Sequence, residues 1–510
     1  MKKNNDEGLQ EAVYLLIKSG YHLDQEAFEL LKEISQDIDI EELRALTKKV
    51  IKKIGMSAQK PLFINRKFLE GVLLTDIYKT KEKKEKTSKK VIFKYAKDVE
   101  PEIDVISDPT KLIGSTGSLS DYIEYFRDRF HKLTSLLCQR MDIKDTISVK
   151  EAKAVLTGSE VKFICMIAEK RETKRGVFLT VEDLESEVVV FFPSDNIELV
   201  EKARRLIADL VVCIQAIKGS NDLFIAKDVF LPDLPLRKPN TAPLPIYAIF
   251  VSDLHIGSKM FMKKEFNRFI EWLNGRIGSR NLVEISGHVK YIVIAGDIVD
   301  GVGIYPQQFD ELEIKDIFDQ YKMAAELLEK IPEHIEIIII PGNHDAVRRA
   351  LPQPALRNEY TEPLEGDDRI HLLGNPSVIS LHGVNVLVYH GRSLDDVISL
   401  LPRMSFEEPE NAMKFLLQCR HLSPVYGERT PISPERTDLL VIDKVPDIFH
   451  AGHVHRFGFT IYRGSLILNS GAWQEQTEYQ KEMGHTPTPG IVPIINLQNL
   501  RVISLNFTIL

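Results

Sequence analysis

The chain has 510 residues, more than one hydrophobic core usually organises, so two or more domains are expected. Its hydrophobic fraction of 44% argues against a disordered chain, and no run of about 18 uncharged apolar residues indicates a membrane span. The net charge of −8 argues against a protein that coats nucleic acid by bulk electrostatics. Nucleic acid stays open as a substrate, because an acidic metal site lowers the net charge while its cations attract phosphate.

Cysteine usage and the N-terminal sequence indicate the cellular compartment. Cys138, Cys165, Cys213 and Cys419 are not paired at CxxC spacing, which favours buried thiols in a reducing compartment over disulfides or zinc ligands. The first residues turn acidic before any apolar core, which argues against a secretory signal peptide. A cytoplasmic location is therefore expected.

Residues 1–55 have apolar residues at helical spacing in three successive segments and are expected to form a small helical domain. Asp39 and Glu42 resemble a capping box at the start of the third helix. This domain could bind a partner, or DNA through four lysines, although a solvated lysine face on a docking domain is the preferred interpretation. These lysines are Lys48, Lys49, Lys52 and Lys53.

Residues 56–117 are expected to be a flexible, Lys-rich linker. The segment 79–90 is almost wholly charged or polar and cannot form a core, and the stretch that follows contains Pro, Asp and Gly. Its lysines could touch DNA without sequence preference, but a solvated tether is the preferred interpretation.

Residues 118–240 are expected to form a helix followed by a small β-barrel. Ser118 is a suitable N-cap for an amphipathic helix over 119–140. Between residues 145 and 235, β-branched and aromatic residues alternate or run together around one helical segment, which suits a five-stranded barrel of the oligonucleotide-binding (OB) type. Such barrels bind either nucleic acid or protein, and the sequence leaves both open. The proline-rich segment 231–245 then marks a domain boundary.

Residues 241–510 repeat the pattern of apolar strand, polar loop and helix, which predicts an α/β domain with ligands at the carboxyl ends of strands. Five short clusters of polar residues follow directly after apolar strands. They are Asp253-Leu254-His255, Gly296-Asp297-Ile298-Val299-Asp300, Gly342-Asn343-His344-Asp345, His390-Gly391 and Gly452-His453-Val454-His455.

These clusters together predict a two-metal site. Alone, Asp-x-His is more often a surface or capping pair and Gly-Asp a turn, whereas Gly-Asn-His-Asp and Gly-His-x-His are moderately specific. Carboxylate, imidazole and amide oxygen suit borderline divalent metals such as Mn, Fe, Zn or Ni. A lone buried Asp would be costly, but a bridge between two cations compensates its charge. Two ions about 3.5–4 Å apart can hold a phosphate and lower the pKa of a bridging water.

The five clusters match the motif DxH…GDxxD…GNHD…H…GHxH and resemble the calcineurin-like metallophosphoesterases over residues 248–475. The segments 389–398 and 420–435, with the helical and barrel regions before them, resemble the small subunit of archaeal D-family DNA polymerases over nearly the whole chain. This resemblance implies a multidomain fold: an N-terminal helical unit, an OB-like β-barrel, and a C-terminal α/β phosphoesterase domain built as a β-sandwich flanked by helices.

The resemblance also implies roles for individual residues. One divalent ion would be bound by Asp253, His255, Asp297 and His455. A second ion would be bound by Asp297, Asn343, His390 and His453, with Asp297 bridging the two. His344 would stabilise charge on the phosphate or protonate the leaving oxygen. Asp300 would orient His344, and Asp345 would be structural or would support the ligands from behind. Arg392 could contact a backbone phosphate, and His421 is as well explained by loop structure.

The family activity implied is 3′→5′ exonuclease, proofreading for a separate large catalytic subunit. That subunit is the expected main partner, with DNA and a sliding clamp as further partners and no membrane. Two alternatives stay open: another metallophosphoesterase, acting on phosphoproteins or small esters, and a non-catalytic assembly subunit with a relic site. The full set of expected ligands favours catalysis, since related eukaryotic B-subunits resemble the same architecture with an eroded site.

Overall fold

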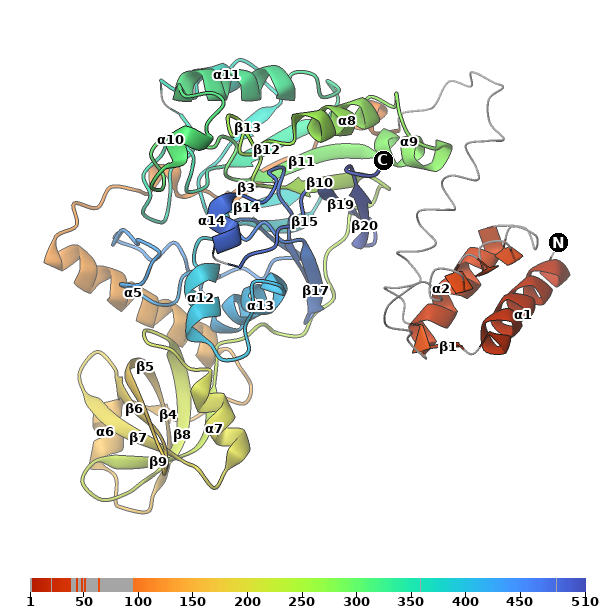
Figure 1. Ribbon diagram of the computed structural model, residues 1–510. Coiled ribbons are helices and arrows are strands. Elements are labelled where there is room, and N and C mark those ends of the chain that lie inside the picture. Colours follow the sequence, from red (N-terminus) through yellow and green to blue (C-terminus); the bar gives the residue numbers. More distant parts are fainter. Residues whose placement is uncertain are drawn as a thin grey trace. The chain divides into compact units, whose positions relative to one another are not determined.

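A computed structural model describes most of the chain (Figure 1). The described residues are 2–19, 21–37, 43–44, 47–48, 50–51, 63–64 and 95–510 except 358 and 483. The chain divides into two compact units, residues 1–92 with 279–282 and residues 93–278 with 283–510. The Lys-rich segment 79–90, the capping box expected at Asp39 and Glu42, and the side chains of Lys49, Lys52 and Lys53 lie outside the described residues.

The described residues of the first unit include the helices α1 (Lys2–Lys18) and α2 (Gln25–Asp37). Between and after them, β1 (His22–Leu23) pairs in parallel with β2 (Phe63–Ile64). The helical periodicity of the sequence produces the core of this unit, because the residues at that spacing face one another. The core residues are Leu9, Ala12, Leu16, Ala27, Leu31, Leu43, Val50 and Ile64.

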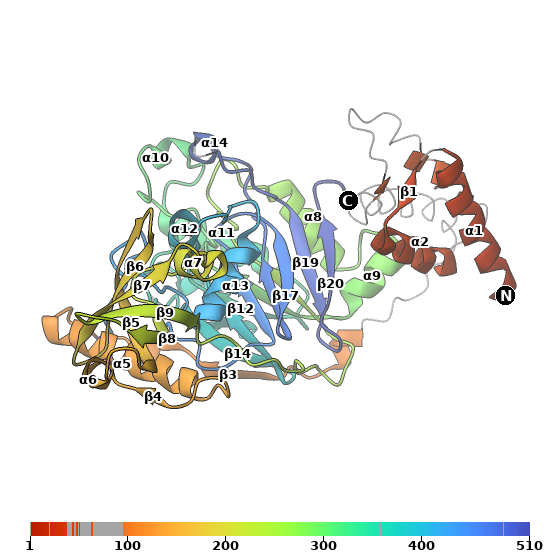
Figure 2. The same ribbon diagram turned by 90° about the horizontal axis from the view of Figure 1, so that it is seen from below.

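A closed barrel forms the first part of the second unit (Figures 1 and 2). Its strands are β5 (Glu160–Thr173), β6 (Gly176–Glu182), β7 (Glu187–Pro193), β8 (Val211–Lys218) and β9 (Leu223–Phe230), with α7 (Ile197–Arg204) between β7 and β8. The order β5-β6-β7-β9-β8 closes through pairing of β5 with β8, and the short β4 (Thr146–Ile147) adds to β5. Alternate residues of β6 and β7 point inward, as the sequence pattern predicted.

Helix α5 (Leu119–Cys138) begins with the capping box of Ser118 and Asp121, which confirms Ser118 as the N-cap. Its apolar stripe packs on β5 and β8 of the barrel through Phe130, Leu133 and Leu137. The short α6 (Val149–Ala154) begins with a second capping box at Ser148. The barrel is thus held on one side by the long amphipathic helix that precedes it.

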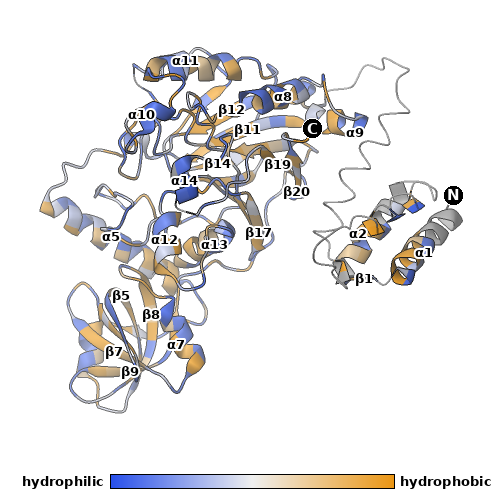
Figure 3. Ribbon diagram, in the orientation of Figure 1, coloured by the Kyte–Doolittle hydropathy of each residue, from blue (hydrophilic) through white to orange (hydrophobic). Residues whose placement is uncertain are grey.

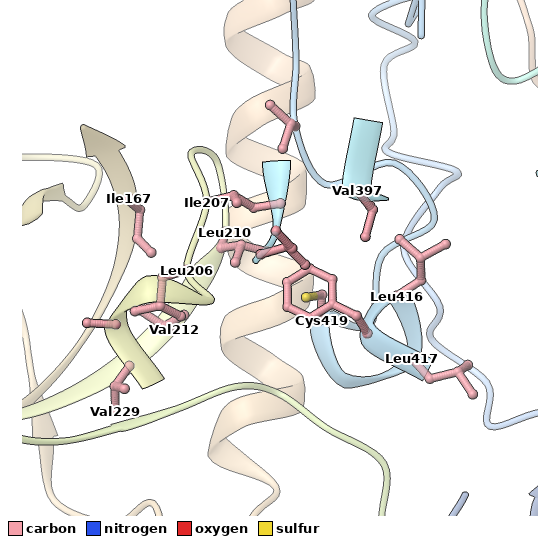
Figure 4. Close-up of a cluster of buried hydrophobic side chains, with 14 of the residues drawn as sticks. Ile167, Leu206, Ile207, Leu210, Val212, Val229, Val397, Leu416, Leu417 and Cys419 are labelled. Atoms are coloured by element: carbon pink, nitrogen blue, oxygen red, sulfur yellow. The ribbon is translucent and has the colours of Figure 1, made fainter. Parts of the chain in front are cut away.

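The barrel also packs against α12 (Leu394–Leu400) and α13 (Pro409–Cys419). Figure 4 shows part of this cluster, with Leu206, Ile207 and Leu210 on the barrel side and Val397 of α12 and Leu416 of α13 on the opposite side of the cluster. Because these side chains belong to one continuous buried cluster, the barrel and the domain that follows share a hydrophobic core.

Two six-stranded sheets form the rest of the unit. The first has the order β13 (Ile370–Leu372), β12 (Glu336–Ile340), β11 (Val289–Ala295), β10 (Tyr247–Val251), β19 (Ile491–Asn496) and β20 (Arg501–Asn506). The second has the order β17 (Gly458–Tyr462), β18 (Ser465–Asn469), β16 (Ile448–Ala451), β15 (Val384–Val388), β14 (Ser377–Leu381) and β3 (Ile103–Ser107). Strands β10 to β13 run parallel, and so do β15, β16 and β18.

The two sheets pack face to face. One buried cluster combines Phe250 and Val293 of the first sheet with Val386, Ile448 and other residues of the second. Figure 3 shows hydrophobic residues concentrated in these strands, whereas α10 and α14 are hydrophilic. The expected β-sandwich layers are therefore present in a multidomain α/β chain.

Helices and turns flank the sandwich. They are α8 (Lys263–Leu273), α9 (Arg280–Gly287), α10 (Gln308–Glu311), α11 (Ile317–Leu328), α14 (Glu478–Glu482) and the 3-10 turn η3 (Glu362–Leu364). In Figure 1, α8 and α11 lie along the sheet that contains β10 to β13. Among the described residues, no helix is both long enough and apolar enough to cross a membrane.

Residues 95–117 differ from the flexible linker expected there. They contain η1 (Tyr95–Asp98), β3 and η2 (Pro109–Lys111), and β3 pairs antiparallel with β14 as an edge strand of the second sheet. The hydroxyl of Tyr291 donates to the carbonyl of Glu102 at 3.2 Å and accepts from its backbone N–H at 2.8 Å. The sequence did not predict this strand, because the segment is polar and contains Pro, Asp and Gly. Its partner strand also lies about 270 residues further along the chain.

A buried ion pair joins α5 to the loop after α13. The Nε of Arg129 lies 2.8 Å from Oδ2 of Asp438, and Nε2 of His421 lies 2.8 Å from the same oxygen. Arg129 also donates to the carbonyl of Pro424 and to the hydroxyl of Tyr125. All of these polar groups are satisfied, so this network fixes the helix to the domain behind it.

Replacement of Asp438 by Asn should lower the free energy of unfolding by about 3–5 kcal/mol, because the charge of Arg129 would stay buried without its partner. Burial opposes ionisation of Asp438, but His421 and Arg129 outweigh it and hold its pKa well below the usual value. The wild-type chain should therefore lose this contribution as the pH falls through and below about 4, whereas Asp438→Asn should lack that loss.

Urea unfolding from pH 7 to pH 3 measures this effect. The control is Lys150→Met, which removes an exposed ion pair with Glu185 and should leave the free energy of unfolding unchanged. Equal stability of Asp438→Asn and wild type at pH 7 would contradict the role of the network.

Candidate metal centre

The polar clusters lie at the carboxyl ends of neighbouring strands. Asp253 follows β10, Asp297 follows β11 and Asn343 follows β12, and these three parallel strands are adjacent in the first sheet. His390 follows β15 and His453 follows β16, which are adjacent in the second sheet. Parallel neighbours end at the same edge, so each sheet brings its own polar loops together, and the packing of the sheets brings the two sets together.

The backbone at these positions adopts a conformation that side chains rarely accept. Five of the seven expected metal ligands have left-handed φ values, namely Asp253 (54°), His255 (50°), Asp297 (52°), His453 (70°) and His455 (58°). Such residues cost about 1–3 kcal/mol each and are concentrated at functional sites. This repeated strain supports a functional role for these loops.

Glycines allow the loops to approach closely. A Cβ on Gly296, whose φ is +87°, would lie 2.7 Å from Nδ1 of His390 and 2.6 Å from the backbone nitrogen of Gly342. A Cβ on Gly452 would lie 2.6 Å from Oδ2 of Asp253. Gly296 and Gly452 are therefore required by the convergence of the loops, not only by a turn.

The first group of side chains contains Asp253, His255 and His455, whose ligand atoms all lie within 4.8 Å of one another. The two Nε2 atoms of the histidines are 3.1 Å apart, and Oδ1 of Asp253 lies 3.5 Å from Nε2 of His455. All three side chains are buried. These are three of the four residues expected to hold one ion.

The second group contains Asp297, His390 and His453, again with ligand atoms within 4.8 Å. Nε2 of His390 lies 3.3 Å from Oδ2 of Asp297 and 2.9 Å from Oδ1 of Asn343. Oδ2 of Asp297 also lies 3.9 Å from Nε2 of His255, which belongs to the first group. Asp297 is therefore close to side chains of both groups.

The donor set fits divalent cations. Oδ1 of Asp253 is buried and has no hydrogen-bond partner among the described residues, although a buried carboxylate oxygen normally has one. The pocket offers carboxylate, imidazole and amide oxygen, the mixture that borderline metals accept. A cation beside Oδ1 would satisfy this oxygen and compensate its charge.

The pKa values of the side chains also indicate that the buried carboxylates need positive charge beside them. Burial opposes ionisation of Asp253, but His455 and His390 outweigh it and hold its pKa at about 2. Burial also opposes protonation of His390, yet the carboxylate of Asp297 raises the pKa of His390 to about 9. The carboxylates therefore require positive charge beside them, which either imidazolium or divalent cations supply, and cation binding would displace the proton.

His344 and Asp300 show a difference from the expected pairing. Nδ1 of His344 donates to the backbone carbonyl of Asp300 at 2.8 Å, while the carboxylate of Asp300 lies 2.9 Å from Nδ1 of His255. Asp300 thus orients His344 through its main chain and orients His255 through its side chain. The structure also groups His344 with His255 and Asp297 within ligand distance, although the sequence motif does not count His344 as a ligand.

Each remaining imidazole is held by a neighbour. Nδ1 of His390 donates to the carbonyl of Ala295 at 2.8 Å, Nε2 of His453 lies 3.1 Å from Oδ2 of Asp395, and Gln480 lies 2.9 Å from Nδ1 of His455. Contacts of this kind fix the orientation of the rings that surround a metal.

Sequence reasoning missed four side chains that support the site. Gln308 and Gln474 are buried and donate to the carboxylate of Asp300, both at 3.1 Å. Asp395 and Gln480 hold histidines, as described above. Asp395 lies five residues after His390, and its acidic character beside a ligand motif was the available signal; the glutamines stand in ordinary helix or loop contexts and gave none.

The other expected residues have distinct positions. The carboxylate of Asp345 accepts from the backbone N–H groups of Asp297 and Gly342, both at 2.8 Å, which fits the structural role expected for it. Arg392 is part-exposed and lies 3.7 Å from Asp395 at the margin of the site. His421 belongs to the buried network of Asp438, so the structural explanation holds for it.

Comparison with known proteins identifies the class. Residues 248–458, which contain all the strand-end clusters, match the family model of the B subunit of DNA polymerases alpha and epsilon. The matched span begins in β10 and ends at the start of β17, so it includes the strands of both sheets that carry the expected ligands.

Curated relatives define the family more narrowly. The chain is 43% identical to the DNA polymerase II small subunit of Pyrococcus horikoshii over 384 residues, 75% of this chain and 62% of the relative. It is 42% identical to that of Archaeoglobus fulgidus over 76% of this chain and 78% of the relative. It is 41% identical to that of Methanothermobacter thermautotrophicus over 78% of this chain and 81% of the relative. The chain belongs to the DNA polymerase II small subunit family.

The match does not extend over the whole of every relative. The aligned region spans less than two thirds of the Pyrococcus relatives. A solved archaeal phosphodiesterase resembles 51% of the chain at 13% identity and a TM-score of 0.26, a likeness too low to define the fold.

Asp300→Asn should weaken metal binding about 10- to 100-fold, because His255 would lose the carboxylate that orients its ring. The measurement is a calorimetric titration of the metal-free chain with Mn²⁺. Asp310→Asn is the matched control, since Asp310 lies ten residues further along the chain with an exposed side chain. Unchanged affinity in Asp300→Asn would contradict the proposed orientation.

Gly452→Ala should reduce the bound metal, because the new methyl group would collide with Ser252 and with Oδ2 of Asp253. Metal content after dialysis, measured by elemental analysis, tests this expectation. Gly114→Ala is the control, because a Cβ there meets no atom within 4 Å. If both variants retain equal metal, close approach of the loops is not a requirement of the site.

Proposed function

We propose that this chain is a 3′→5′ exonuclease that proofreads for a DNA polymerase, hydrolysing phosphodiester bonds with two divalent ions. The observation that carries the proposal is the arrangement of two His/Asp groups around Asp297, with a buried oxygen of Asp253 left for a cation. Membership of the small-subunit family supplies the context, and the family resemblance of the motifs supplies the direction of digestion.

We also propose a domain layout for the chain. We assign residues 241–510 to a calcineurin-like phosphoesterase domain, residues 118–240 to a helix with an OB-like barrel, and residues 1–55 to a helical domain. Strand β3 would extend the phosphoesterase domain back to Ile103.

The metals would be held by the two ligand sets assigned above. They are Asp253, His255, Asp297 and His455 for one ion, and Asp297, Asn343, His390 and His453 for the other. Two bound ions supply Lewis-acid chemistry, which neutralises phosphate charge and makes water nucleophilic near neutral pH.

His344 is the side chain that we assign to proton transfer. Its side chain is 14% exposed, against 2% for His255, so it lies where the site opens to substrate. The carbonyl of Asp300 accepts the Nδ1 proton, which leaves Nε2 facing the ligand groups. In this position Nε2 can contact the scissile phosphate and donate a proton to the leaving 3′ oxygen, while Arg392 can contact a neighbouring backbone phosphate.

The proposed partners are DNA and the large catalytic subunit of a D-family DNA polymerase, because the relatives are named as small subunits of a polymerase. A sliding clamp is a further proposed partner. A non-catalytic assembly role is the second candidate, which the small-subunit name favours. The retention of every motif ligand favours catalysis, since an assembly role would not require them.

Asn343→Ala and His453→Ala should abolish digestion of 3′-labelled single-stranded DNA in Mn²⁺ while the circular dichroism spectrum stays unchanged. His344→Ala should slow cleavage about 100- to 10,000-fold with the metal still bound. His371→Ala is the control, because His371 pairs with Glu336 away from the ligand groups and should cleave like wild type.

The assay is performed with and without the large subunit. Shortening from the 3′ end supports the exonuclease, and hydrolysis of only phosphopeptides or small esters would assign another phosphoesterase. No hydrolysis in either condition, with tight binding to the large subunit, would assign the assembly role. A loss of metal in His344→Ala would make His344 a ligand and overturn its assigned role.

A further inference from the structure

One outward-facing row of residues crosses the barrel. Strand pairing places Arg171 of β5 opposite Phe178 of β6, Phe178 opposite Phe191 of β7, Phe191 opposite Ile225 of β9, and Ile225 opposite Ile217 of β8. Their neighbours along each strand, such as Val177, Phe192 and Phe224, point inward to the core, so this row faces outward.

The centre of the row is an aromatic pair. The rings of Phe178 and Phe191 are stacked, with centroids 4.6 Å apart and planes 30° apart. The guanidinium of Arg171 lies over the ring of Phe178, 5.3 Å from its centroid. Beside the pair, Val189 and Ile225 keep 38% and 40% of their surface exposed. Water-soluble surfaces seldom gather aromatic and aliphatic side chains in this way without a ligand or partner.

Cations collect at one end of this row. Lys174 and Arg175 form the exposed turn between β5 and β6, and the backbone N–H of Ser194, just after β7, donates to the carbonyl of Arg175 at 2.9 Å. Lys227 lies two residues beyond Ile225, and so at the same end, because β7 and β9 are parallel. Glu182 and Glu187 pair across the opposite end of β6 and β7. The face is therefore polarised along its strands.

These cations are not used by the barrel itself. The ion pairs among its described residues use Lys150, Lys153, Lys202 and Arg204. No ion pair with a described carboxylate forms at Arg171 or at the three cations of the edge, which are Lys174, Arg175 and Lys227. A stacked aromatic pair edged by unpaired cations matches a ligand with flat apolar rings on a polyanionic chain.

We propose that this face binds single-stranded DNA, with a base stacked on Phe191, at the end of the Arg171–Phe178–Phe191 stack, and phosphates beside Lys174, Arg175 and Lys227. Stacking on aromatic side chains combined with a basic track is how proteins hold unpaired nucleic acid without reading its sequence. Duplex DNA offers its phosphates but hides its base faces, so it binds this face less well. The choice of DNA rests on the proposed function, whereas the stacking geometry does not.

The position of the acidic end argues against a basic protein partner at the aromatic pair. A partner attracted by Glu182 and Glu187 would sit over the β6–β7 turn, away from the unpaired cations. Only a ligand that carries negative charge next to apolar rings uses both the aromatic pair and the basic edge.

The test is a fluorescence anisotropy titration of the full chain with labelled oligothymidylate of about 16 nucleotides. EDTA is present, so that neither hydrolysis nor metal contributes. Phe191→Ala should weaken binding about 5- to 150-fold, and Phe191→Tyr, which keeps the ring, should bind like wild type. Phe459→Ala, an exposed aromatic on β17, is the control and should also bind like wild type.

A second variant tests the basic edge without touching the partly buried ring. The triple change Lys174→Gln, Arg175→Gln and Lys227→Gln should lower the slope of log Kd against log salt by about 2, or about 0.7 for each lost contact. All three side chains are exposed, so this variant should fold. Tight binding by wild type with both losses supports the proposal.

Three outcomes would overturn it: no binding by wild type, equal binding by Phe191→Ala and wild type, or an unchanged salt slope in the triple variant. If Phe191→Ala instead loses only its association with the large subunit, the face is a protein interface and the proposal fails. The nuclease assay separates the two proposals. If the chain binds oligothymidylate through the stack but does not cleave DNA, only the proposed function is overturned. If the chain cleaves DNA but Phe191→Ala binds like wild type, only the DNA-binding face is overturned.

Discussion

The rest of the structure depends on the burial of two carboxylates, those of Asp253 and Asp297, where the ends of two sheets meet. Removing these charges from water costs several kcal/mol unless positive charge compensates them nearby. The surrounding loops are arranged for that compensation: left-handed backbone turns direct the ligands inward, and glycines such as Gly296 and Gly452 let the loops approach. The sandwich thus provides a rigid frame on which strained loops persist.

Much of the site could be predicted, because ligands in α/β domains collect at the carboxyl ends of the strands. An apolar strand followed directly by Asp, Asn or His places that residue at the sheet edge, and this held for Asp253, Asp297 and His390. The supporting contacts could not be predicted in the same way. The use of the Asp300 carboxylate on His255, rather than on His344, depends on the path of two loops 45 residues apart.

Local patterns also predicted the barrel and the capped helix α5, since alternation and capping act over a few residues. The edge strand β3 escaped prediction, because its sequence is polar and its pairing with β14 is distant in the chain. Pairing of this kind is decided by tertiary packing, for which propensity gives no signal. The same limit applies to Arg129 and Asp438, an ion pair whose partners are 309 residues apart.

Helix α12 connects the candidate metal centre to the barrel. Asp395 in its first turn holds the imidazole of His453, and Val397, half a turn later, packs in the cluster that includes the barrel residues Ile207 and Leu210. One short helix therefore serves two contacts at once: its first turn holds an imidazole of the candidate metal centre, and its next residues pack in the cluster that contains the barrel.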